Sequence, residues 1–158
     1  MTECARLADQ ARRAFDGEAW HGDPLMEILR DVDAKTAAAH SIRGAHSIWE
    51  LVLHIAAWDG AVTRRIAGQV VNLPDDENFP PISDSSESAW KNAVERMKKT
   101  HAEMVDAIAA FSDGRLMEGV PGKSKQPYYT YFYMFAGIVQ HELYHGGQIV
   151  LLKKAARP

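Results

Sequence analysis

Residues 129–154, YTYFYMFAGIVQHELYHGGQIVLLKK, carry one continuous face at helical spacing. Seven side chains recur there at intervals of three and four: Tyr131, Met134, Ile138, His141, His145, Gln148 and Leu152. Residues spaced in this way lie one above another on the same side of a helix. The face is apolar apart from its two histidines and one glutamine. We therefore expect it to point into a helical bundle, with the histidines inside.

Three further helices are predicted upstream. Residues 2–15 are rich in alanine and arginine with apolar positions at 3–4 spacing, and residues 90–111 repeat the heptad-like pattern of the last segment. Between them, Ser47-Ile48-Trp49-Glu50 is a capping box, which predicts a helix from there to about Ala67. Asp84-Ser85-Ser86-Glu87 repeats that pattern before the third long helix.

The segment between the second and third long helices is predicted to be a loop. Residues 71–83 contain Pro74, Pro80 and Pro81, and proline interrupts a helix. No stretch alternates between apolar and polar residues over the length of a strand. The sequence thus predicts an all-α fold, an up-and-down four-helix bundle with a metal site at mid-bundle, formed by a single domain over residues 1–158.

Composition excludes several classes of function. The chain has 18 Lys and Arg against 21 Asp and Glu, with no basic stripe, so we expect no nucleic-acid partner. Cys4 is the sole cysteine, which excludes an intrachain disulfide and a cysteine-based zinc cluster. The first residues lack the apolar stretch of a secretion signal, and no apolar run approaches the ~20 residues that span a bilayer. We expect a cytoplasmic protein with no membrane partner.

The strongest motif is His141-Glu142-Leu143-Tyr144-His145, an H-E-x-x-H sequence. It places two imidazoles on one helix face, as in zinc peptidases, where a third ligand follows downstream. Only 13 residues follow His145, and the extended peptidase motif fails because Gln148 and Leu151 stand where glycine and histidine are needed. A third ligand is therefore expected from an upstream helix.

His54 is the best candidate for that ligand. It lies on the apolar side of the second long helix near its middle, and mid-helix positions meet when helices pack antiparallel. His101, on the inner face of the third long helix, is the runner-up and otherwise a residue that supports the ligands from the next layer. The remaining histidines, at positions 21, 40 and 46, are expected to face solvent or to form local hydrogen bonds.

The chain resembles the DinB-like (YfiT-like) superfamily. The resemblance rests on residues 46–58, HSIWELVLHIAAW, and 137–149, GIVQHELYHGGQI, and extends to Trp20, the Asn78-Phe79-Pro80 loop and Trp90. It implies a four-helix bundle that holds one divalent metal ion with three histidines, here His54, His141 and His145. Members often carry aspartate directly after the first histidine of the last pair, where this chain has Glu142.

Such a site suits zinc or nickel first, with iron or cobalt as further candidates. Glu142 lies about 100° around the helix from His141 and is a candidate general base for a bound water. Gln148 lies on the same face as His141 and can hydrogen-bond a ligand or a substrate.

We expect a metal-dependent enzyme of small molecules, either a low-molecular-weight thiol transferase or a hydrolase; thiol transfer is implied by the resemblance. The alternative is a non-catalytic structural or sensing metal protein, which a closed four-ligand site including His101 would favour.

A homodimer is a further expectation. The last helix is also apolar away from the His141 face, at Phe132, Phe135, Val139 and Val150. The first helix, whose apolar side chains are mostly alanines, covers only part of this surface. A second copy of the chain can cover the remainder.

Overall fold

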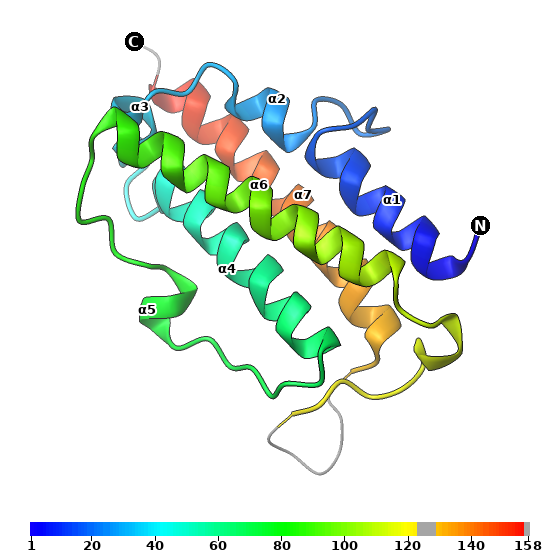
Figure 1. Ribbon diagram of the computed structural model, residues 1–158. Coiled ribbons are helices and arrows are strands. Elements are labelled where there is room, and N and C mark those ends of the chain that lie inside the picture. The colour runs from blue at the N-terminus through cyan, green and yellow to red at the C-terminus, as the bar shows by residue number, and fades with distance from the viewer. Residues whose placement is uncertain (123–128, 157–158) are drawn as a thin grey trace.

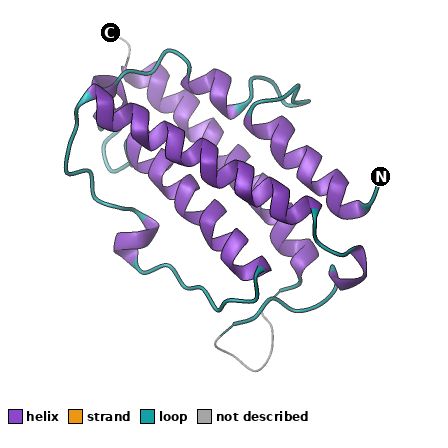
Figure 2. Cartoon of the chain, viewed as in Figure 1, coloured by secondary structure: helices purple, strands orange, loops and turns teal. Residues whose placement is uncertain are grey.

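A computed structural model describes residues 1–122 and 129–156. Figure 2 shows helices joined by loops, with no strand in the described part of the chain. The elements in order are α1 Glu3–Phe15, α2 Leu25–Leu29, α3 Ala34–Ala38, α4 Ile48–Ile66, α5 Asp75–Asn78, α6 Glu87–Ala109, the 3-10 turn η1 Asp113–Arg115 and α7 Tyr131–Ala156.

The four long helices pack as a bundle, which confirms the predicted all-α bundle fold. Helix α4 packs against α6 and α7, and α1 packs against the same two helices from the other side. Their directions depart from a strict up-and-down order: α4 and α6 run the same way, and α1 and α7 run opposite to them (Figure 1). The cause is the crossover over residues 67–86, which carries the chain back along the bundle before α6 begins.

This crossover contains a helical turn that the prolines were predicted to exclude. Helix α5 spans Asp75–Asn78, with Pro74 at its N-cap and Pro80 just beyond its end. Proline is tolerated at both places, because the first amide of a helix lacks an internal partner and the helix has already ended before Pro80. The prolines therefore bracket the turn rather than prevent it.

The helix starts follow local hydrogen bonding. At α4 both bonds of the predicted capping box are present, from Glu50 N to Ser47 Oγ and from Ser47 N to the Glu50 carboxylate. The second predicted box does not form. Helix α6 is capped by the Ser86 side chain alone, and Glu87 instead accepts a hydrogen bond from Ala34 N at the start of α3. The glutamate that was expected to close a local box therefore links two distant helix starts.

The apolar core is divided into two clusters along the bundle axis. On α4, Ile55 belongs to one cluster and Val62 to the other, and on α6 the same holds for Met97 and Met104. Buried polar side chains occupy the level between the two clusters, namely His54, Asp59, His101, Glu142 and His145. The fold thus places its polar interior at mid-bundle, where the sequence predicted a metal site.

Part of the apolar surface that suggested a dimer is used within the chain. Phe135 is fully buried and packs edge-to-face against Phe111. The exposed large apolar side chains of α7 are Phe132, Tyr133, Tyr144 and Leu151. The homodimer stays a prediction. Among the described helices, none is both long and apolar enough to cross a bilayer.

The capping box gives a test of the fold. Changing Ser47 to alanine removes the oxygen that caps the start of α4, and we expect a loss of about 1 kcal/mol in the free energy of unfolding. Urea denaturation followed by circular dichroism measures the change. Ser85→Ala, at an exposed serine beside the α6 cap, is the control and should alter stability far less. Equal stabilities for both variants and the unmodified protein would show that the cap contributes nothing.

Candidate metal centre

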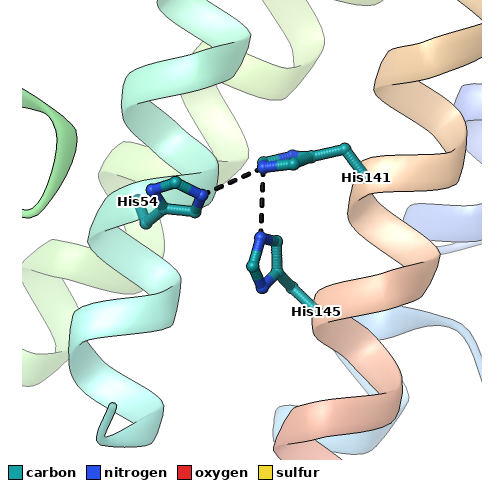
Figure 3. Close-up of side chains that lie close together, drawn as sticks. All are labelled: His54, His141 and His145. Carbon is teal, nitrogen blue, oxygen red and sulfur yellow. Dashed lines mark hydrogen bonds between the residues drawn. The ribbon is translucent and has the colours of Figure 1, made fainter. Parts of the chain in front are cut away.

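Three imidazoles from two antiparallel helices meet at mid-bundle. His54 projects from α4, and His141 and His145 project from successive turns of α7 (Figure 3). Nε2 of His141 lies 3.0 Å from Nε2 of His54 and 3.1 Å from Nε2 of His145. The rings of His54 and His145 are buried, and that of His141 is half-buried. We call these three residues the histidine cluster.

The spacing of the ring nitrogens fits a metal ion. Nitrogen ligands about 2.0 Å from a divalent ion lie about 3.3 Å apart in a tetrahedral site and about 2.9 Å apart as neighbours in an octahedral one. The two separations in the histidine cluster fall between these values. A neutral donor set of this kind suits zinc, nickel, iron or cobalt.

Hydrogen bonds to Nδ1 orient the rings of His54 and His145 so that their Nε2 atoms face His141. Nδ1 of His54 lies 3.0 Å from the carbonyl oxygen of Asn78, and Nδ1 of His145 lies 2.7 Å from the side-chain oxygen of Gln148. Because an amide or carbonyl oxygen only accepts, each Nδ1 carries the hydrogen and each Nε2 keeps its lone pair. Outer hydrogen bonds of this type hold metal-ligating histidines in one tautomer. Gln148 therefore contacts a member of the cluster directly.

The loop after α5 supports His54 in a second way. The ring of Phe79 stacks on His54 with centroids 4.3 Å apart, and on its other side it stacks on His46 at 3.9 Å. The side-chain oxygen of Asn78 also accepts a hydrogen bond from the Trp58 indole. In the sequence, residues 78–80 stand out only through the family resemblance. Their role in orienting His54 depends on the packing of the crossover against α4, which the sequence alone does not show.

Burial and the neighbouring rings keep the three imidazoles uncharged at neutral pH. Burial lowers the pKa of His54, His141 and His145 below the usual value. The effect is largest for His141, where burial and then the nearby rings of His145 and His54 lower the pKa to about 3. Neutral imidazoles have the lone pairs that a metal needs.

The other predicted site residues lie elsewhere. Glu142 is buried, and its Oε1 is 2.7 Å from Nδ1 of His101, so these two side chains pair with each other. His101 does not join the histidine cluster; among the described residues it groups with Asp59 and Glu142. The side chains of His21, His40 and His46 are exposed, as predicted.

A small cavity adjoins the histidine cluster at His141. It has a volume of about 190 Å³ and is mostly apolar. Its lining includes Trp58, Val62, Met134, Gly137, Ile138, Tyr129, Tyr133, Arg65 and His141. Arg65 is nearly buried, and its guanidinium donates to the Tyr129 hydroxyl and to the Val71 carbonyl. The cavity thus combines an apolar wall, one fixed positive charge and one imidazole of the cluster.

A sequence profile of the DinB superfamily matches residues 19–149, most of the chain. This protein belongs to the DinB superfamily. The matched region contains all three members of the histidine cluster, helices α4 and α6 in full and most of α7. Metal binding in the DinB superfamily agrees with the donor group that the structure brings together. No curated protein and no solved structure matches the chain significantly.

Metal removal tests the centre. The ligands come from helices far apart in sequence, so metal binding should stabilise the folded state alone. At a free metal concentration of 100 times Kd the gain is about 2.7 kcal/mol, which is roughly 5–10 °C in Tm for a domain of this size. Thermal melts with zinc or nickel and after chelation measure it.

Two variants sharpen the comparison. His54→Ala should lose most of the metal-dependent rise in Tm, because the cluster then keeps two imidazoles. His21→Ala removes an exposed histidine outside the cluster and should keep the full rise. Superimposable melting curves for metal-free and metal-loaded protein would contradict the assignment.

Proposed function

We propose that this protein is a divalent-metal-dependent enzyme that acts on small molecules, by transfer of a low-molecular-weight thiol or by hydrolysis. The observation that carries the proposal is the convergence of three imidazole Nε2 atoms beside a cavity. His54, His141 and His145 would hold the ion. Bound there, a divalent metal supplies Lewis acidity and lowers the pKa of a water or thiol ligand.

The number of ligands favours catalysis over a purely structural role. Structural zinc sites are closed by four protein ligands, whereas catalytic sites use three and leave a position open. In the described part of the chain, the histidine cluster offers three ligand atoms, one from each imidazole, that lie within 4.8 Å of one another. His101, the residue that would have closed the site, instead pairs with Glu142.

The cavity supports a small, partly apolar substrate. Ligand pockets for drug-sized molecules measure about 300–1,000 Å³, so this cavity of about 190 Å³ suits a smaller group. Its wall beside His141, formed by side chains such as Trp58 and Ile138, is mostly apolar. Arg65, held in place by Tyr129 and Val71, presents a positive charge to a polar or anionic end of the substrate.

The chain's one thiol is unsuited to act as the nucleophile. Cys4 is fully buried in the first turn of α1, and burial together with the Asp113 carboxylate raises the pKa of its thiol to about 12. A thiol in this state is not reactive at neutral pH. The attacking atom would therefore come from water or from a thiol substrate. Glu142 as a general base stays a prediction; its carboxyl group is buried against His101.

A non-catalytic metal protein is the second candidate. The histidine cluster joins α4 to α7, and an ion there would link two helices of the bundle. Such a link would stabilise the fold or report metal levels without turnover. The two candidates differ in whether the cavity beside His141 is used.

The first experiment combines elemental analysis with activity assays. Metal-loaded protein should turn over thiol-acceptor or ester and amide substrates. His54→Ala should lose metal and more than about 100-fold in kcat/KM. Cys4→Ser should keep both. Full activity in metal-free His54→Ala would place the reaction away from the histidine cluster.

The second experiment fills the cavity. A Cβ built at Gly137 meets no atom within 4 Å, so Gly137→Leu can occupy the cavity without disturbing the backbone of α7. We expect this variant to bind metal normally but to have a lower kcat/KM, chiefly because its KM is higher. Gly147→Leu, at a helical glycine that is equally open and lies outside the cavity lining, is the matched control. Unchanged kinetics in Gly137→Leu would show that the reaction does not use this cavity.

A further inference from the structure

A second group of ligand-type side chains lies at the centre of the bundle. Asp59 comes from α4, His101 from α6 and Glu142 from α7. Their exposed fractions are 0%, 4% and 1%, and they occupy the level between the two apolar clusters. We call them the carboxylate cluster. Helix α1, the one long helix that supplies no member of this cluster, covers it: Phe15 at the end of α1 stacks on the His101 ring with centroids 3.8 Å apart.

The hydrogen bonds inside this cluster are incomplete. Nδ1 of His101 is 2.7 Å from Oε1 of Glu142 and 3.8 Å from Oδ2 of Asp59, so it reaches one carboxyl group only. Within residues 1–122 and 129–156, neither oxygen of Asp59 has a hydrogen-bond partner, nor does Oε2 of Glu142. A buried polar atom without a partner costs about 1–3 kcal/mol, and more when it is charged. Something that these side chains do not supply is therefore needed at this place.

The charge of the carboxylate cluster also indicates a bound cation. Two carboxylates and a neutral imidazole carry two negative charges, and a divalent cation balances them. All three side chains are almost fully buried, so water cannot offset these charges. Nδ1 of His101 forms a hydrogen bond with the Glu142 carboxyl group only, so an imidazolium there would leave the Asp59 oxygens without a donor.

We propose that Asp59, His101 and Glu142 form a second divalent-cation site, separate from the histidine cluster. Ligand atoms of the three residues lie within 4.8 Å of one another. Neighbouring ligands about 2.1 Å from an ion are about 3 Å apart and opposite ones about 4 Å apart. Nδ1 of His101 lies 2.7 Å from Oε1 of Glu142 and 3.8 Å from Oδ2 of Asp59, which is close to this range. Two carboxylates and one imidazole suit Mn²⁺, Fe²⁺ or Zn²⁺.

The site is of a kind that helical bundles support. Carboxylates and histidines projecting inward from facing helices hold metal ions in the cores of other four-helix bundles. Here an ion would bind α4, α6 and α7 together, whereas the histidine cluster joins only α4 and α7. His141 and Glu142 are adjacent in sequence but lie about 100° apart around α7, so the two sites use different faces of that helix.

Metal stoichiometry tests the proposal. Metal-free protein is loaded with Zn²⁺ and, in a parallel sample, with Mn²⁺. Excess ion is removed by gel filtration, and bound metal is counted by elemental analysis. We expect about two ions per chain in the unmodified protein, about one in His54→Ala, about one in Asp59→Asn and none in the double variant. Asparagine keeps the shape of aspartate, and Glu142→Gln serves as a second variant if Asp59→Asn does not fold by circular dichroism.

The outcomes separate this site from the proposed function. One ion per chain that is lost in His54→Ala and kept in Asp59→Asn would overturn the second site and leave the histidine cluster intact. In that case protons, rather than a cation, neutralise the buried carboxylates. One ion that is kept in His54→Ala and lost in Asp59→Asn would support the second site and remove the basis of the proposed enzyme. No bound ion in any sample would overturn both.

Discussion

Burial of imidazole and carboxyl groups at mid-bundle is the constraint on which the structure depends. An ordinary helical bundle fills this level with apolar side chains, whereas here five polar residues separate two apolar clusters. Removing such groups from water is unfavourable unless each finds a hydrogen bond, a counter-charge or a neutral form. The remaining features of the molecule are arranged so that most of these groups are satisfied.

The two polar clusters meet this constraint differently. In the histidine cluster, outer hydrogen bonds to Asn78 and Gln148 satisfy Nδ1 of His54 and of His145, and burial keeps the rings neutral. Nδ1 of His141 has no hydrogen-bond partner among the described residues. What remains is a set of lone pairs at one point, which is a metal-binding arrangement. In the carboxylate cluster, a single hydrogen bond between His101 and Glu142 leaves Asp59 without a donor. The histidine cluster is thus nearly complete without an ion, and the carboxylate cluster is not.

The crossover between α4 and α6 links the fold to the site. Because it returns along the bundle, α4 and α6 run parallel, and α5 lies beside the middle of α4 (Figure 1). This position brings the Asn78 carbonyl to His54 and places Phe79 between two imidazole rings. A short turn that contributes no buried residue of its own therefore helps to orient His54.

The sequence by itself determined the long helices and the residues of the histidine cluster. Periodicity located the inner faces of α4, α6 and α7, and the capping box placed the start of α4 at Ser47. The residues assigned as ligands, His54, His141 and His145, came from an H-E-x-x-H motif, a matching depth on a second helix and a family resemblance. The three side chains do lie together, because spacing along one helix fixes which side chains share a face, and their role as metal ligands stays a prediction.

Only the tertiary structure decided which inner faces meet. Asp59 lies about 140° around α4 from His54 and was not singled out in the sequence. It becomes interior because α6 and α7 cover different sides of α4. The same packing turned Glu142 and His101 toward each other and left neither in the histidine cluster. Periodicity describes a single helix, whereas contacts between residues 41 to 110 positions apart depend on helix direction, crossover path and neighbour, which no local pattern encodes.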